Sequence, residues 1–137
     1  MRKRHKQGGN YEIDLGSDGV VVCSVHRRKE LTRDQGARCA QEQAVHLIAL
    51  AARPAHEARA LLYDLTDAPD VWGPATQRAL ESMLKPWEAA HKRVIIVVGP
   101  EPIQRFNVEA LLKACAPALG RIVGSLGEAE SLLQRGR

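Results

Sequence analysis

The sequence predicts an α/β fold, a mixed sheet of about five strands covered by about four helices. Three observations predict it. A short turn, Gly16–Gly19, joins two strand-like segments near the start of the chain, which indicates an antiparallel pair. Helical and strand patterns then alternate along the chain, as is typical of parallel β–α units. The run Arg93–Val98 (RVIIVV) lacks alternation, which indicates a central strand covered on both faces.

Length and charge indicate one domain with a basic tail. A chain of 137 residues, 45% hydrophobic, is the size of one ordinary domain. We expect that domain over residues 11–137, after a flexible basic arm at residues 1–10. The arm contains Arg2, Lys3, Arg4 and Lys6, and these residues account for the whole net charge of +4. Because the rest of the chain is neutral, nucleic acid is not expected as a partner.

The first half of the chain predicts two strands and a helix. Tyr11–Leu15 alternates apolar and acidic residues, as a half-exposed edge strand does, and Val20–His26 is the next strand. Thr32 is expected to cap a helix with Gln35, and Arg53-Pro54 to end that helix. The helix is expected to bury one apolar face: Ala37, Ala40, Ala44, Leu47, Ile48 and Ala51.

The middle of the chain predicts a strand over Arg59–Leu65, a loop over Thr66–Gly73, and a helix that begins at Pro74. Pro86 is expected to kink or break that helix. The helix is expected to pack through an apolar stripe: Ala79, Leu80, Met83, Leu84 and Trp87.

After Arg93–Val98, the turn Gly99–Pro102 leads into a third helix, which Pro117 and Gly120 end. A short strand, Arg121–Gly124, and a closing helix, Leu126–Gln134, complete the chain. The third helix is expected to pack through one side: Ile103, Phe106, Ala110, Leu111 and Ala114.

The cysteines favour a reducing compartment and exclude the usual metal sites. Cys23, Cys39 and Cys115 are odd in number, far apart and form no CxxC pair. We therefore expect buried, reduced thiols and a cytoplasmic protein, with no metal and no cofactor. No apolar run is long enough to span a membrane.

Three stretches of sequence are distinctive: Ala60–Leu65 (ALLYDL), Val94–Pro102 (VIIVVGPEP) and Arg121–Leu133 (RIVGSLGEAESLL). Together with the order of the elements, they give the chain a pattern that resembles the STAS-like group, the sulphate transporter and anti-sigma factor antagonist domains, especially its small stand-alone bacterial members. The resemblance covers roughly residues 11 to 135. It implies a partner-binding module, in some members switched by phosphorylation and in others binding small ligands.

In anti-sigma factor antagonists the switch is a hydroxyl at the start of the helix after the central strand, in an Asp-Ser-Ser-Gly sequence. The matching stretch here, Asp70–Thr76 (DVWGPAT), has no serine, and Pro74 occupies the helix start. We therefore expect no standard phosphoserine switch, which leaves Thr66 and Thr76 as the hydroxyl candidates.

The loop before the second helix is the first candidate for a partner-binding surface, because ligands gather at the carboxyl ends of parallel strands. Trp72 either anchors a partner or folds back over the core, with Asp67 and Asp70 capping the helix. Both interpretations stay open. The candidate residues are Thr66, Asp67, Asp70, Val71, Trp72, Gly73 and Thr76.

Two further candidate sites follow other strands. Gly99 and Glu101 lie in a loop that could hold an anion or a partner, although the neighbouring prolines and the carboxylate of Glu101 argue against an anion. Arg27, Arg28 and Lys29 form a basic patch that would suit an acidic partner.

No catalytic residues are expected, since no nucleophile, base and oxyanion donors come together in the sequence. The sequence favours a non-enzymatic regulatory or scaffolding module, of a signalling kind, that binds a protein. The alternative is a carrier domain of the same fold that binds a small apolar molecule or a lipid. A homodimer through an exposed edge at Tyr11–Leu15 is a further hypothesis.

Overall fold

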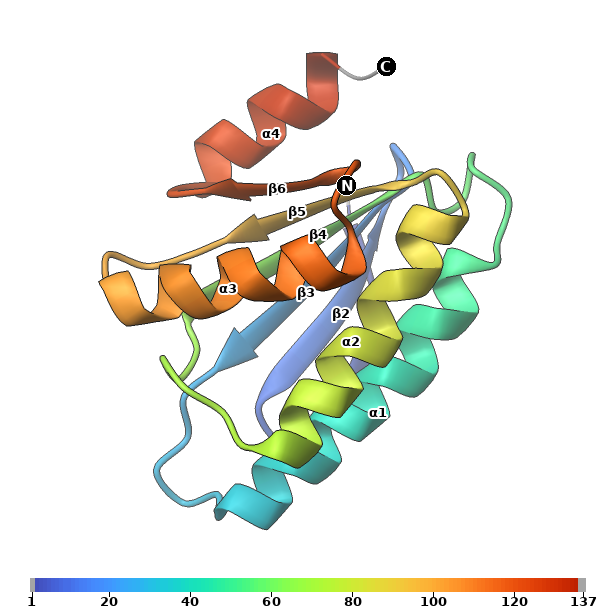
Figure 1. Cartoon of the computed structure of the whole chain (residues 1–137). Coiled ribbons are helices and arrows are strands. Elements are labelled where there is room, and N and C mark those ends of the chain that lie inside the picture. The colour runs from blue at the N-terminus through green and yellow to red at the C-terminus, as the bar shows by residue number, and fades with distance from the viewer. Residues whose placement is uncertain (1, 136–137) are drawn as a thin grey trace.

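The computed structural model describes residues 2–135, which form one sheet and four helices (Figure 1). The elements follow in chain order: β1 Arg2–Gln7, β2 Tyr11–Gly16, β3 Val20–His26, α1 Arg33–Ala51, β4 Ala60–Asp67, α2 Pro74–Ala89, β5 Arg93–Val97, α3 Pro102–Cys115, β6 Gly120–Val123 and α4 Leu126–Arg135.

The six strands lie in the sheet in the order in which they occur in the chain. β1, β2 and β3 pair antiparallel, and β3, β4, β5 and β6 pair parallel. The predicted mixed α/β fold is confirmed, with one strand more than the sequence indicated. β5 lies between two parallel neighbours, as its unbroken apolar run predicts.

The additional strand is β1, so the prediction of a flexible arm is wrong for residues 2–7, while residue 1 lies outside the described residues. β1 pairs with β2, and Arg4 Nε donates to Asp14 Oδ1 at 2.5 Å. On the other side of the sheet the His5 ring meets that of His46 edge-on. β2 is consequently an inner strand, and the edge that a Tyr11–Leu15 homodimer would need is covered.

Helices cover the two faces of the sheet unequally (Figure 1). Each parallel connection steps to the next strand in the same direction, and right-handed crossovers then place α1, α2 and α3 on one face. This face holds the larger core, which includes Tyr11, Leu47, Leu61, Trp87 and Ile96. α4 packs on the opposite face over a smaller core: Val20, Val22, Ala60, Leu62, Ile95, Val97 and Val123, with Ala129 and Leu133 of α4 itself.

α1 begins as the sequence predicts. Thr32 Oγ1 accepts from the Gln35 N–H, and Gln35 Oε1 accepts from the Thr32 N–H, which is a complete capping box. The helix ends at Ala51, where the buried Lys92 ammonium donates to the carbonyl oxygens of Ala51 and Arg53. Burial lowers the pKa of Lys92.

Two predicted helix faces are rotated in the structure. In α1, Ile48 is exposed, and the buried position between Ala40 and Ala44 belongs to Gln43. In α3, Ile103 and Phe106 face solvent, whereas the buried positions are Gln104, Val108, Leu111, Leu112 and Cys115. The prediction placed Ile103 and Phe106 inside because they are large and apolar. Gln104 is buried in their place, because its amide bonds the Gly99 N–H and the Leu65 carbonyl.

α2 buries the whole predicted stripe from Ala79 to Trp87 and continues through Pro86 to Ala89. The prediction that Pro86 breaks the helix is therefore wrong. Pro86 lies in the last turn, so its missing N–H removes one hydrogen bond near the helix end and does not stop the helix.

The C-terminal end of α4 is held by two arginines. Arg59 Nη1 donates to the Leu133 carbonyl at 3.3 Å, and Arg93 Nη1 donates to the Leu132 carbonyl at 2.7 Å. These carbonyls belong to the last turn of the helix, where C=O groups have no intrahelical N–H donor, and the arginines supply the missing donors. The two arginines thus connect the amino-terminal ends of β4 and β5 to the last turn of α4.

Candidate functional site

A cleft of about 510 Å³ opens at the carboxyl ends of β3 and β4. It lies between the N-terminal ends of α1 and α2, which stand side by side at the lower left of Figure 1. The β3–α1 and β4–α2 segments form its rim. Open α/β sheets bind ligands outside the carboxyl ends of their strands.

Most of the cleft wall is apolar. The wall comes from strand ends, from both helices and from the β4–α2 loop, and includes Val25, Leu31, Ala40, Leu65, Ala68, Pro69, Val71, Trp72, Pro74 and Leu80. The remaining lining is polar or basic, and no Asp or Glu is among the lining residues in the described part of the chain.

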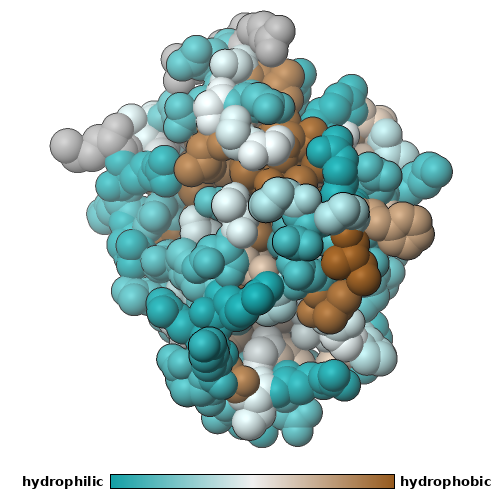
Figure 2. Space-filling view, turned by 90° about the vertical axis from the view of Figure 1, so that its left-hand side faces the viewer, coloured by the Kyte–Doolittle hydropathy of each residue, from teal (hydrophilic) through white to brown (hydrophobic). Residues whose placement is uncertain are grey.

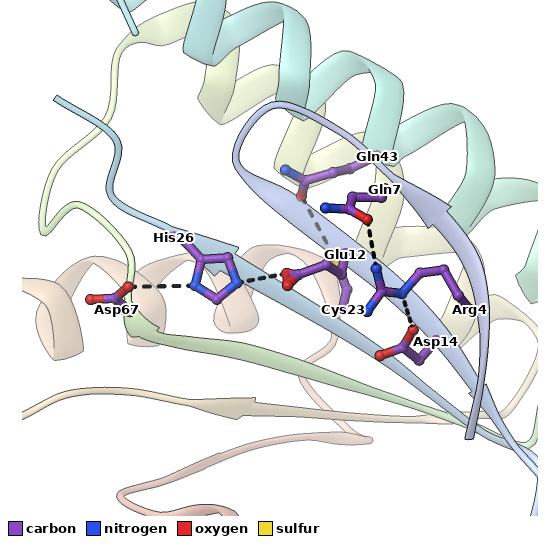
Figure 3. A network of polar contacts seen from close by, with 8 residues as sticks. All are labelled: Arg4, Gln7, Glu12, Asp14, Cys23, His26, Gln43 and Asp67. Atoms are coloured by element: carbon purple, nitrogen blue, oxygen red, sulfur yellow. Dashed lines mark hydrogen bonds and ion pairs between the residues drawn. The ribbon is translucent and has the colours of Figure 1, made fainter. Parts of the chain in front are cut away.

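The deep end of the cleft carries a buried polar network. Gln43 is 2% exposed, and its Oε1 accepts from the Tyr63 hydroxyl at 2.5 Å. The Cys23 thiol lies 3.8 Å from the same oxygen (Figure 3). No hydrogen bond between described residues reaches Gln43 Nε2. Asn10, another lining residue, likewise has a buried Oδ1 without a partner among residues 2–135.

Burial keeps the network neutral. It raises the pKa of Tyr63 well above its ordinary value, and the neighbouring Cys23 adds to this effect. Burial also raises the pKa of the Cys23 thiol, to which the carboxylates of Glu12 and Asp14 contribute. All three cysteines are free and buried, as the sequence predicts. A buried thiol with a raised pKa is packing and not a nucleophile.

Three arginines, Arg27, Arg28 and Arg33, line the mouth of the cleft. Arg27 donates to the Ala68 carbonyl at 3.4 Å and lies 3.7 Å from Asp70 Oδ1. The guanidinium groups of Arg28 and Arg33 form no hydrogen bond or ion pair with any other residue in 2–135. The mouth therefore presents uncompensated positive charge.

The N-terminus of α2 adds backbone donors to the same mouth. Gly73 is the N-cap residue and supplies no side-chain cap, so the prediction that Asp67 or Asp70 caps this helix is wrong. Pro74 at the first position has no N–H, which leaves the N–H groups of Ala75 and Thr76 without intrahelical acceptors. The first turn of a helix favours an anion.

Trp72 packs against the core, as one of the two interpretations predicts, and its role as a partner anchor stays a prediction. Its ring is half-buried against the larger core and lines the cleft at the same time. Its indole N–H donates to Gln77 Oε1 at 2.5 Å, which ties the β4–α2 loop to the first turns of α2. One edge of the ring is thus fixed, and the remaining surface faces the cleft.

His26, at the end of β3, lies between two carboxylates (Figure 3). Its Nε2 is 2.6 Å from Glu12 Oε2, and its Nδ1 is 3.4 Å from Asp67 Oδ2. These partners could not be predicted from the sequence, because they come from two other strands, β2 and β4. Both ring nitrogens face carboxylates, so no described hydroxyl or thiol contacts the imidazole.

The predicted loop residues divide into two groups. Val71, Trp72, Gly73 and Thr76 line the cleft. Thr66, Asp67 and Asp70 do not line it. The Thr66 hydroxyl donates to Asp64 Oδ1 at 2.6 Å, while Asp67 and Asp70 face His26 and Arg27.

The remaining candidates lie apart from the cleft lining. The Gly99 N–H donates to Gln104 Oε1 at 2.7 Å, and Gln104 Nε2 donates to the Leu65 carbonyl. This N–H is therefore not available to an anion. Glu101 is the N-cap residue of α3, without a side-chain cap bond. In the basic patch, Arg27 and Arg28 reach the cleft, but Lys29 is not among its lining residues.

Three large apolar side chains of the β4–α2 loop and α3 are exposed, and together they are called the exposed apolar strip. They are Val71, Ile103 and Phe106, which are 58%, 52% and 70% exposed. Val71 lines the cleft, whereas Phe106 lines a separate groove between α3 and β6. Asn107 Nδ2 donates to the Asp70 carbonyl, which holds the β4–α2 loop against α3 beside these side chains. Figure 2 faces the carboxyl ends of the strands and shows apolar surface gathered at its right side among hydrophilic surface.

Within residues 2–135, no cluster of three or more His, Cys, Asp or Glu side chains could hold a metal ion. Among the helices within 2–135, none has both the length and the apolar content needed to cross a membrane.

Comparison with known proteins gives the fold and no function. No protein-family model matches the chain, and no curated protein sequence matches it. Its structure is similar to the NMR structure of the protein TM1081, with a TM-score of 0.53 and 15% sequence identity. That alignment covers 96% of this chain and 92% of the other. The resemblance to STAS-like domains stays a prediction.

Several residues of the cleft escaped the sequence analysis, namely Asn10, Arg33, Gln43 and Tyr63. One signal was present for Gln43. It interrupts the apolar face of α1 between Ala40 and Ala44, and a polar side chain at a core position needs a partner.

Proposed function

We propose that the chain is a non-enzymatic regulatory or scaffolding module that binds a protein through the exposed apolar strip beside the cleft. The single observation that carries this proposal is the exposure of Val71, Ile103 and Phe106. Large apolar side chains exposed near one another are typical of protein interaction sites. A cytosolic location belongs to the proposal, and the three free, buried cysteines support it.

The polar rim contributes specificity. Arg27 and Arg28 line the same cleft as Val71, so a partner that covers the strip comes close to positive charge. An acidic partner surface is the complement of this arrangement. Trp72 also lines the cleft, next to Val71 in the chain, and is a candidate anchor.

The experiment compares capture of partners from an extract of the source cells by matched variants. Phe106→Asp places a charge on the strip, on α3 and away from the cleft lining. Val45→Asp is the control, because Val45 is similarly exposed, at 68%, on α1. A protein that cross-links to the wild type and to Val45→Asp, and is lost with Phe106→Asp, supports the proposal. Equal capture by all three contradicts it.

A second function, small-molecule binding, is favoured by a different observation. The cleft of about 510 Å³ is of ligand size, and the amide nitrogen of the buried Gln43 at its deep end has no partner in residues 2–135. A carrier or ligand-sensing module of this fold would use the cleft and leave the strip on α3 free.

A further inference from the structure

We propose that the cleft binds a small amphipathic anion, an apolar body carrying one phosphate or carboxylate group, with the anion at the mouth and the body against Trp72. This proposal rests on the second function above and names the chemistry of its ligand.

The mouth gathers positive charge that the described residues do not neutralise. Arg33 is the first residue of α1, and its Cδ lies 3.6 Å from where a Cβ on Gly73, the N-cap of α2, would be. Its guanidinium thus stands near two positive helix ends. A cation is unfavourable there, and a helix start ordinarily carries acidic residues. A bound anion would remove this conflict.

The donors at the mouth suit one anionic group. Arg28 and Arg33 supply guanidinium N–H groups with no other ion pair in residues 2–135. Ala75 and Thr76 supply backbone N–H groups at the open start of α2. Guanidinium and backbone donors together are the usual partners of phosphate and carboxylate oxygens. No lining carboxylate in the described chain competes for them.

The deep end shows that the ligand is more than a free ion. Gln43 is 2% exposed, its Oε1 is occupied, and its Nε2 has no partner in residues 2–135. Gln43 Nε2 is not among the buried atoms without a partner in residues 2–135, so it is accessible from the cleft and can donate to an acceptor on a ligand. Between Gln43 and the mouth the wall is apolar, with Leu65, Leu80 and Trp72. The ligand therefore has an apolar body that ends in, or contains, one hydrogen-bond acceptor.

Titration of the ¹⁵N-labelled full chain, followed by NMR, tests the proposal. The probes are phenyl phosphate and hexanoate, their neutral counterparts phenol and hexanol, and inorganic phosphate. Phenyl phosphate or hexanoate is expected to shift the Trp72 indole N–H, the Gln43 side-chain amide and the Thr76 backbone N–H. The indole of the buried Trp87 is an internal control and should not move. Inorganic phosphate should shift only the mouth.

Variants separate a specific site from general attraction to a basic protein. Arg33→Ala is expected to weaken binding of the anionic probe by about tenfold or more, as the loss of a charge-assisted hydrogen bond would. Arg38→Ala removes an exposed arginine of the same helix that does not line the cleft, and should leave binding unchanged. The stronger of the two anionic probes identifies whether a phosphate or a carboxylate is preferred.

Three results would overturn the proposal: no saturable shift with either anionic probe up to millimolar concentration, equal binding of the neutral counterparts, or equal weakening by both arginine variants. None of these results bears on the protein partner, because Phe106→Asp tests that function outside the cleft. The two functions can therefore fail separately.

Discussion

At the scale of single residues, the buried contact between Gln43 and Tyr63 links the core to the cleft. The two side chains come from α1 and β4, and each is almost fully buried. Both could have been replaced by apolar residues without loss of the fold class. A buried polar pair lowers the stability of the fold unless each group has a hydrogen-bond partner. In Gln43 the Oε1 atom has a partner in residues 2–135, and Nε2 has none.

Gln43→Leu is expected to lower the free energy of unfolding by about 1–3 kcal/mol, because the Tyr63 hydroxyl then loses its acceptor while it remains buried. Adding Tyr63→Phe to this variant should recover part of the loss, since no polar group is then left unpaired. Urea unfolding of the single and double variants measures the coupling. Strictly additive losses would show that the two side chains do not depend on each other.

The same burial predicts how stability depends on pH. Cys23 and Tyr63 ordinarily ionise near 9.0 and 10.0, and in the folded protein both pKa values are well above these. At alkaline pH the unfolded chain therefore loses protons that the folded chain keeps. Stability from these groups is complete below the ordinary pKa values and is lost as pH rises past them.

Urea unfolding between about pH 8 and pH 11 should show stability falling by about 1.4 kcal/mol per pH unit for each such group that ionises in the unfolded chain. Tyr63→Phe should make the decline above pH 10 shallower. An unchanged slope in this variant would mean that Tyr63 ionises equally in both states.

At the scale of elements, α1 and α2 start side by side but in different ways. α1 has a capping box, whereas α2 begins at an uncapped glycine followed by proline. Both starts could be read from the sequence, since Thr32, Gln35 and Pro74 act on their own neighbours. The orientation of α3 could not, because it depends on Gln104, whose amide bonds Gly99 and Leu65 from separate elements.

Gly73→Asp is expected to stabilise the protein by a few tenths of a kcal/mol, because Asp is a better N-cap than Gly. The backbone at Gly73, with φ −85° and ψ 177°, accepts any residue, and the nearest neighbour of a new Cβ is Arg33 Cδ at an ordinary 3.6 Å. The new carboxylate would occupy the place proposed for the anion. Thermal denaturation should therefore show a higher Tm and a smaller shift with phenyl phosphate. A lower Tm would contradict the open N-terminus described for α2.

At the scale of the whole molecule, the mixed α/β fold could be predicted from the sequence, but the strand order and the first strand could not. The alternation of helices and strands indicates parallel strands joined by right-handed crossovers, but it does not specify which strands are neighbours. β1 was missed because Arg2–Gln7 has no apolar alternation, and its order comes from pairing with β2. The cleft was found only in part, since its residues come from β3, α1, β4 and α2, and only their spatial arrangement brings them together.

A variant that lacks residues 1–7 is expected to be less stable and to self-associate. Without β1, the backbone N–H and C=O groups on the outer edge of β2 lose their partners and can pair with another chain. Sedimentation at increasing protein concentration measures the association. Arg4→Ala is the control, since it removes only a surface ion pair with Asp14, worth at most about 1 kcal/mol, and an exposed hydrogen bond to Gln7, and should stay monomeric if the wild type is. A truncated chain of unchanged stability and size would show that β1 does not protect the edge.

The unequal covering of the sheet has a consequence for how the protein opens. α4 alone covers the second face, so its release uncovers only the smaller core and breaks the bonds from Arg59 and Arg93. The rest of the sheet keeps α1, α2 and α3. Partial opening of this kind requires less free energy than global unfolding, and amide hydrogens in α4 should exchange with solvent before those of β4 and β5. The C-terminal helix would then be the first foldon to leave, and the apolar sheet surface beneath it the first interior to meet water.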